Sequence, residues 1–163
     1  MFAHRFQEAI AQLRKATELE PSSAFAENML GEALVLTGQI DEAIRHLEHA
    51  YETSKDVPTQ DVPSLSFLGW GHGVKGERDQ ALQVLAQLQE MERLGTPVGA
   101  FVYAWIYVGL GQKERAIDFL EESWRKKETG PITVIKVDPI FDPLRGNSRF
   151  EELVNQILPS ASK

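Results

Sequence analysis

Apolar residues recur at helical spacing along most of the chain, in runs that end at glycine or proline. In the first run Phe6, Ile10 and Leu13 fall on one face of a helix, and Pro21 closes the segment. Seven such runs predict helices over about residues 2–20, 24–37, 41–51, 64–75, 79–94, 97–110 and 113–127. The pattern therefore predicts an all-α fold in which short turns join consecutive helices.

A short motif returns three times, each time at a break between two of these helices. Each copy is a glycine, four mostly polar residues and an alanine that opens an amphipathic run, at Gly38–Ala43, Gly76–Ala81 and Gly111–Ala116. The closing alanines lie 38 and 35 residues apart, and Ala9 lies 34 residues before the first of them. A period of this size is typical of helical repeat arrays, which present a curved surface to another chain and seldom catalyse reactions.

The residues at fixed points of each unit resemble those of the tetratricopeptide-repeat family. The matching positions are Ala9, Leu13, Ala16 and Pro21 in a leading half unit, then Leu30, Gly31, Leu34, Ala43, Leu47 and Ala50, then Leu65, Leu68, Gly69, Ala81 and Leu85, and finally Tyr103, Ala104, Tyr107, Ala116 and Leu120. Three positions depart from the family pattern: His72 replaces a large apolar residue, and Leu88 and Ser123 replace alanine. The resemblance implies a right-handed superhelix of helical hairpins whose first helices line a concave surface.

We expect the repeat array to occupy residues 1–128, with a half repeat at 2–21 and repeats at about 24–57, 62–95 and 97–128, and a C-terminal segment at 129–163 to pack on it. In that segment Ile132–Val137 is β-branched, which predicts an extended stretch. Asp138 and Asp142 each precede a proline and predict the caps of a short helical turn. Ser148–Glu151 has the pattern of a capping box before a last helix that runs through Ile157.

Capping residues also predict where three of the array helices start. Ser22 or Ser23 is expected to cap the helix that begins at 24, and Asp41 its partner. Thr96, with a proline directly after it, is expected to cap the apolar helix that ends at residue 110.

The tail resembles the close of tetratricopeptide-repeat modules fused to bacterial winged-helix regulators, adenylate cyclases and serine/threonine kinases. The matching stretches are Val137–Arg145 and Ser148–Phe150. In those proteins the repeats form a C-terminal sensory or interaction module behind an output domain. Residues Phe2–Glu20 match only the second helix of a unit, so we expect a fragment of a longer protein. A native N-terminal cap, or a weak homodimer through this edge instead of a monomer, is the alternative.

The repeat register places Glu32, Trp70 and Trp105 in one column, each eleven residues before the alanine of its unit. The resemblance implies that this column and its neighbours lie on the concave surface. The candidate partner-binding residues are Phe25, Asn28, Glu32, Ser66, Phe67, Trp70, Phe101, Val102 and Trp105. This aromatic, largely uncharged set favours an apolar peptide or helix as partner. A small ligand held among the aromatic side chains of a sensory domain is the alternative.

Residues Pro97–Leu110 carry no charge on any side, and a helix of this kind is normally buried. We expect the chain's own tail to cover it near Phe101 and Trp105, through Ile132, Val134, Ile135, Val137, Ile140 and Phe141. An external ligand on the same residues is the other interpretation, and both hold if the tail can be displaced. Gly71 and Gly73 fit either close helix packing or the close approach of a ligand or the tail.

Composition narrows the function further. The net charge of −7 and the pI near 5.1 disfavour a nucleic acid or an anionic membrane as partner. The absence of cysteine excludes disulfides and thiolate metal sites and fits the reducing cytoplasm. His46 and His49 have metal-ligand spacing without a clearly converging carboxylate, so we expect no metal and no cofactor there. With no catalytic constellation in the sequence, the prediction is a non-catalytic interaction scaffold with a protein or peptide partner.

Overall fold

The computed structural model describes residues 2–57, 60–128 and 131–157, which form helices and turns with no strand in these ranges. The predicted all-α fold is confirmed. Positions 58–59 of the loop before the second full repeat, and positions 129–130 and 158–163 of the predicted C-terminal segment, lie outside the described residues.

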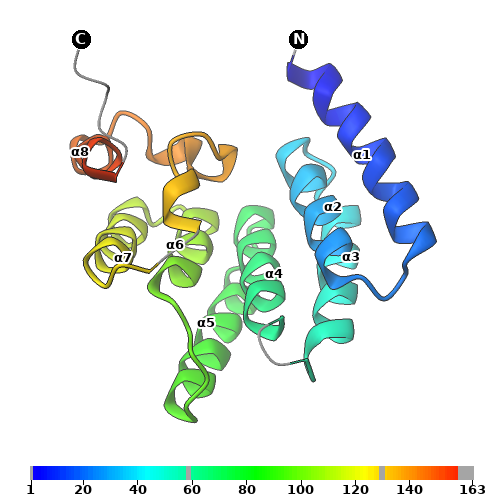
Figure 1. The fold of residues 1–163 in the computed structure, drawn as a ribbon, viewed down its shortest axis with the longest axis horizontal. Coiled ribbons are helices and arrows are strands. Elements are labelled where there is room, and N and C mark those ends of the chain that lie inside the picture. Colours follow the sequence, from blue (N-terminus) through cyan, green and yellow to red (C-terminus); the bar gives the residue numbers. More distant parts are fainter. Residues whose placement is uncertain (1, 58–59, 129–130, 158–163) are drawn as a thin grey trace.

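A single helix precedes a row of helical hairpins. α1 (Phe2–Leu19) is followed by the pairs α2 (Ala24–Leu36) and α3 (Ile40–Ser54), α4 (Asp61–Lys75) and α5 (Arg78–Arg93), and α6 (Ala100–Gly109) and α7 (Lys113–Arg125). α2 packs on α4 and α4 packs on α6, so the first helices of the hairpins lie side by side (Figure 1). This row is the arrangement of a helical-hairpin solenoid, as predicted.

The repeated glycine motif builds the same turn in every hairpin. The three glycines have φ angles of 81°, 87° and 69° at Gly38, Gly76 and Gly111, in the left-handed region that side chains disfavour. After each glycine the next backbone N–H donates to the carbonyl five residues earlier, which closes the first helix. The second helix then begins at once, capped at Gln39 in the first hairpin. The prediction that Asp41 caps this helix was therefore wrong.

Glycines also set the distance between α4 and its neighbours. A Cβ on Gly73 would lie 2.7 Å from the carbonyl carbon of Gly109, and a Cβ on Gly109 would lie 2.5 Å from the carbonyl oxygen of Trp70. The backbones of α4 and α6 therefore touch directly. A Cβ on Gly71 would meet Leu47 of α3 at 2.8 Å. Close helix packing thus accounts for both glycines that the sequence left open.

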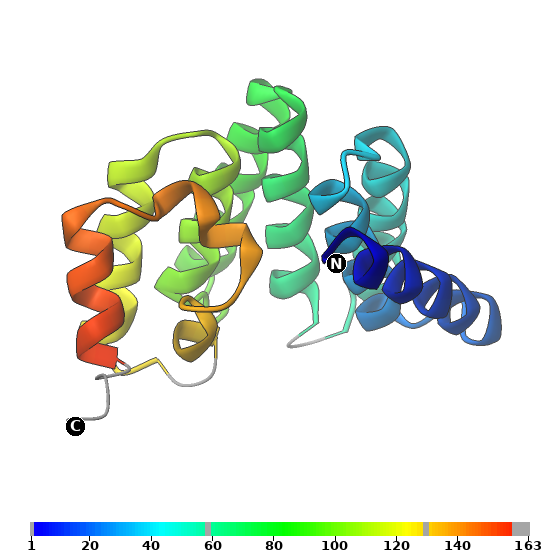
Figure 2. The same cartoon turned by 90° about the horizontal axis from the view of Figure 1, so that it is seen from above.

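The tail folds over the third hairpin in short helical pieces. It contains the 3₁₀ turns η1 (Pro131–Val134) and η2 (Pro139–Leu144) and the helix α8 (Ser148–Ile157). η2 packs on α6 and α8 packs on α7 (Figure 2). Arg149 fastens α8 to α7 by donating to Glu114, Asp118 and Glu121 at 3.1, 2.8 and 2.7 Å.

The predicted extended stretch at Ile132–Val137 was wrong. Its first part is η1, and the Val137 N–H donates to the Val134 carbonyl at 2.8 Å to close a further turn. Ile132 and Ile135 are both buried, and a repeat of three residues per turn brings both to the same side. An extended chain would have pointed them to opposite faces.

Three further predicted caps were wrong. Asp142 does not cap a helix, because it lies inside η2, whose N-cap is Asp138. α6 begins at Ala100 and not after Thr96, because Glu128 accepts from the N–H groups of Ala100 and Phe101 at 2.9 and 3.3 Å. α8 is capped one residue earlier than predicted, since Asn147 Oδ1 accepts from the N–H two residues on at 3.0 Å.

Two other caps were predicted correctly. Ser23 Oγ accepts from Ala26 N–H at 3.4 Å, and Asp138 Oδ1 accepts from Ile140 N–H at 2.9 Å. In both cases the cap and the helix start lie next to each other in the sequence, so local pattern was sufficient.

Candidate functional site

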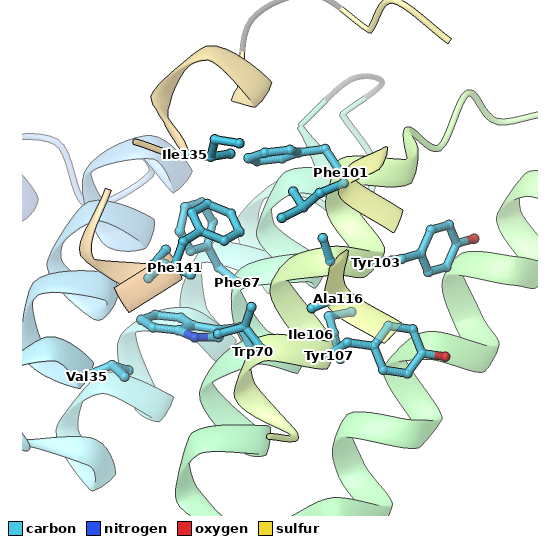
Figure 3. Packing of buried hydrophobic residues seen from close by; sticks show 14 of the residues in the cluster. Val35, Phe67, Trp70, Phe101, Tyr103, Ile106, Tyr107, Ala116, Ile135 and Phe141 are labelled. Carbon is cyan, nitrogen blue, oxygen red and sulfur yellow. The ribbon is translucent and has the colours of Figure 1, made fainter. Parts of the chain in front are cut away.

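The tail covers the aromatic face of α6. Ile132, Ile135, Ile140 and Phe141 are all buried. The ring of Phe141 lies 5.5 Å from that of Phe101, in a tilted contact (Figure 3). Val134 and Val137 do not take part in this cover, because their side chains are exposed.

Much of the predicted partner surface is core. The buried members of the set are Asn28, Ser66, Phe67, Trp70 and Phe101, of which Asn28 and Phe101 also line a hollow. Trp70, only 2% exposed, extends between Val35 of α2 and Ile106 of α6 (Figure 3). A partner cannot reach Ser66, Phe67 or Trp70 while the tail and α6 stay in place.

The remaining candidates line hollows between the helices. We call the first the Trp105 hollow; its volume is 280 Å³, and it is lined by Pro63, Gly99, Phe101, Val102, Trp105, Ser123, Glu128 and Ile132. The ring of the half-buried Trp105 packs against that of Phe67 in a tilted contact, with ring centroids 4.5 Å apart. Its indole N–H and the Ser123 hydroxyl are buried without a hydrogen-bond partner. The hollow is thus apolar, with unused hydrogen-bonding groups in the side chains around it.

The Asn28 hollow adjoins the first and has a volume of 490 Å³. It is lined by Glu20, Ser22, Ser23, Ala24, Phe25, Asn28, Gln60, Pro63 and Ser64. Pro63 lines both hollows, so they adjoin at the start of α4, and we call the two together the groove. Phe25 is 72% exposed, whereas Asn28 is 5% exposed. Asn28 Nδ2 donates to Ser64 Oγ at 2.8 Å, and its Oδ1 accepts no hydrogen bond.

The Glu32 hollow lies between α1 and α2 and has a volume of 430 Å³. Its lining residues are Phe6, Ala9, Gln12, Leu13, Met29, Glu32 and Ala33, all of them apolar except Gln12 and Glu32. The Glu32 carboxylate is half-buried there and has no ion-pair partner in the described part of the chain. Burial, with the charge of Asp138 from the tail as a smaller cause, raises the pKa of Glu32 to about 7.

Family models described as tetratricopeptide repeat match residues 24–49 and 100–123. These ranges correspond to the hairpins α2–α3 and α6–α7, which have the same turn and the same buried alanine. The chain contains tetratricopeptide repeats. Repeats of this family are protein-interaction scaffolds that are generally non-catalytic, which makes another protein the coarse expectation for its partner. Neither the curated proteins nor the solved structures gave a significant match to it.

His46 and His49 form hydrogen bonds within the repeat array. His46 Nδ1 lies 2.6 Å from Glu27 Oε2, and His49 Nε2 lies 2.9 Å from the Pro21 carbonyl oxygen. Glu27 is the converging carboxylate that sequence reasoning missed, since it lies on the preceding helix. Among the described residues no cluster of three or more potential ligands could hold a metal ion, and no helix there is long and apolar enough to cross a membrane.

Sequence reasoning also missed Pro63, although the repeat register contained the signal. Pro63 and Phe25 each stand eighteen residues before the alanine of their repeat, at Ala81 and Ala43. The structure places both on the rim of the Asn28 hollow. Ile132 was expected only as part of the cover, yet it forms one wall of the Trp105 hollow.

Proposed function

We propose that this tetratricopeptide-repeat protein is a non-catalytic interaction module that binds an apolar peptide or helix of a partner in the groove of the Trp105 and Asn28 hollows. The observation that carries the proposal is the Asn28 side chain, which lines the groove and has a buried amide oxygen without a donor. An unpaired buried polar group costs about 1 to 3 kcal/mol. A backbone N–H of a bound peptide would remove that cost.

The accessible side chains fit the apolar part of such a partner. Phe25 and Pro63 are exposed on the rim, and Val102 and Trp105 are half-buried deeper in the groove. Exposed aromatic groups at a groove bury large area with little loss of rotamer freedom. The resemblance of the tail supports a place for this module within a larger cytoplasmic bacterial regulator or signalling enzyme.

A small ligand in a regulatory domain is the second candidate. The feature that favours it is the Trp105 hollow, whose walls are nearly all apolar and whose volume is 280 Å³. A cavity of about 150 Å³ is already sufficient to bind benzene, so one aromatic ring would fit. A ligand of this size would not extend to Phe25.

Selection from a random dodecapeptide library displayed on phage tests the proposal. The parent chain is compared with the double variant Phe25→Ala/Pro63→Ala, whose exposed positions can change without harm to the core. Leu94→Ala is the matched control, because it removes an exposed apolar side chain outside the groove.

We expect peptides enriched on the parent to bind the double variant at least about tenfold more weakly, equal to about 1.4 kcal/mol, and to bind the control unchanged. Failure to enrich any peptide, or equal binding to the parent and the double variant, would overturn the proposal. Binding of small aromatic compounds with no effect of the double variant would favour the second candidate.

A further inference from the structure

The three hollows have one sign of charge. Glu20 lines the Asn28 hollow, Glu128 the Trp105 hollow, and Glu32 the hollow named after it. Their lining residues include no lysine, arginine or histidine. An apolar groove with carboxylates along it is complementary to a segment that carries apolar and positively charged side chains.

Glu32 is the carboxylate best placed to select such a segment. It forms no ion pair within the described ranges, and its hollow is otherwise lined by apolar groups such as Met29, with Gln12 as the one uncharged polar side chain. The charge that acts on it most is that of Asp138, which has the same sign. A half-buried carboxylate in these surroundings is costly when ionised and without a counter-ion. A lysine or arginine would lay its alkyl stem on the apolar wall and place its cationic head at the carboxylate.

Asn28, one turn before Glu32 in α2, also favours a partner that donates hydrogen bonds. Asn28 lies four residues before Glu32, so both side chains leave the same face of the helix. Asn28 is nine-tenths or more buried, and its unpartnered atom is an acceptor. The unpartnered groups of these two side chains are therefore acceptors, and a partner that matches them must bring hydrogen-bond donors.

We propose, on the basis of the proposed function, that the partner segment is a cationic apolar peptide, one of whose lysine or arginine side chains binds Glu32 between α1 and α2. The rest of the segment follows α2 past Asn28 to the apolar part of the groove. Glu32 then acts as a specificity-determining residue, and the apolar hollows supply the remaining affinity.

The test uses the same displayed library at pH 8, where the Glu32 carboxyl is ionised. Peptides are selected on the parent, on Glu32→Gln and on Glu48→Gln. The last is a matched control that removes an exposed carboxylate from α3, outside the three hollows. Circular dichroism first establishes that the variants are as helical as the parent.

We expect lysine or arginine at a fixed position of the peptides enriched on the parent and on Glu48→Gln, and loss of this preference on Glu32→Gln. Synthetic versions of one enriched peptide, with that lysine or arginine kept or replaced by glutamine, complete a double-mutant cycle. Replacement of the lysine or arginine by glutamine should weaken binding to the parent by about tenfold, which corresponds to about 1.4 kcal/mol. The same replacement should weaken binding to Glu32→Gln by less than about twofold.

Enriched peptides without a basic residue at a fixed position would overturn the cationic partner while leaving the proposed function intact. A basic preference that Glu32→Gln retains in full would overturn the role of Glu32. If no peptide is enriched on any of the three proteins, the proposed function fails, and this inference fails with it.

Discussion

Because Gly73 and Gly109 have no side chains, the backbones of α4 and α6 can touch. Gly73 faces the backbone of Gly109 and Leu110, which cannot move aside without shifting the whole helix. Gly71, half a turn away, instead faces the terminal methyl groups of Leu47 and Ile44. The two positions lie in one helix and carry the same residue, yet the cost of adding a methyl group should differ.

We expect Gly73→Ala to destabilise the protein by about 3 kcal/mol, because overpacking against backbone forces two helices apart. Gly71→Ala should cost less than about 1 kcal/mol, since side-chain ends can adjust and alanine is the better helix former. Urea unfolding followed by circular dichroism measures both. Equal losses for the two variants would contradict the backbone contact.

Glu32 makes the stability of the folded chain depend on pH. Burial and Asp138 raise its pKa from 4.5 to about 7, so the folded state binds this proton more tightly than the unfolded chain. The contribution of Glu32 to the free energy of unfolding is therefore greatest at low pH, and it falls as the pH rises from 4.5 to about 7. Above pH 7 the folded state has the full cost of an ionised, half-buried carboxylate.

Glu32→Gln should accordingly be more stable than the parent at pH 8, by at most about 3 kcal/mol, at 1.36 kcal/mol for each unit of pKa shift. The difference should nearly vanish at pH 4.5. Unfolding in urea at the two pH values measures it, with Glu48→Gln as the exposed control. A difference that grows toward low pH would have the wrong sign for this explanation.

At the scale of elements, α6 depends on a residue that lies 28 positions away. The helix is preceded by Gly99, which has no side chain to cap it, and the carboxylate of Glu128 accepts the first two N–H groups instead. A carboxylate at this end also interacts favourably with the helix dipole. The cap thus ties the end of the third repeat to its beginning.

Glu128→Ala is expected to cost about 1 to 2 kcal/mol, the upper range for loss of an N-cap, and Glu128→Gln about half of that. Equilibrium unfolding of the two variants provides the measurement. Glu122→Ala serves as the control, because Glu122 of α7 forms an exposed ion pair with Lys126. No loss in Glu128→Ala beyond that of the control would show that α6 needs no cap.

The tail is held chiefly by a few apolar side chains. Phe141 is fully buried and touches the rings of Phe101 and Phe150. We expect Phe141→Ala to cost about 3 to 5 kcal/mol, because it leaves a cavity under η2. Val137→Ala, at a residue 74% exposed in the same segment, should change stability by less than about 0.5 kcal/mol. A red shift of tryptophan fluorescence in the first variant alone would report exposure of Trp105.

The sequence was sufficient for the helices and the hairpin turns, because these depend on apolar spacing and on glycine at one position of each repeat. It was insufficient where a partner lies far along the chain. Thr96 has the pattern of a cap, but Glu128 caps α6 instead. The β-branched run at 132–137 has the pattern of an extended stretch, but it forms helical turns that are buried against the array.

The candidate site residues also differ in how far their positions depend on the neighbouring helices. Phe25, Asn28 and Glu32 line hollows between the helices. Trp70 does not, because it is covered by the close approach of α6, which depends on a glycine in the next repeat. Register alone identifies the helix face, whereas the depth of a side chain depends on the neighbouring helices.

For the whole molecule, the interfaces between helices differ along the array. α4 packs on α2, α3, α5 and α6, whereas α1 packs mainly on α2. The link from α1 to α3 is the exposed ion pair of Arg14 with Glu42, which contributes little. The free energy of local opening should therefore be lowest at α1.

Hydrogen exchange followed by mass spectrometry should show α1 exchanging first, α2 and α3 next, and α4 and α6 last. Arg14→Ala should leave this order unchanged, because the exposed ion pair is not what holds α1. Uniform protection from α1 to α6 would contradict the graded interfaces and indicate a single cooperative unit.

The tail has a mechanical consequence. A solenoid changes its pitch through small rotations of each hairpin against the next, much as a spring does. η2 on α6 and α8 on α7 brace the third hairpin as one block, while in the described residues the main contacts of the tail do not extend to α1 or α2. When the array bends or stretches, most of the strain should fall between its first helices, so that this end is compliant and the other end is stiff.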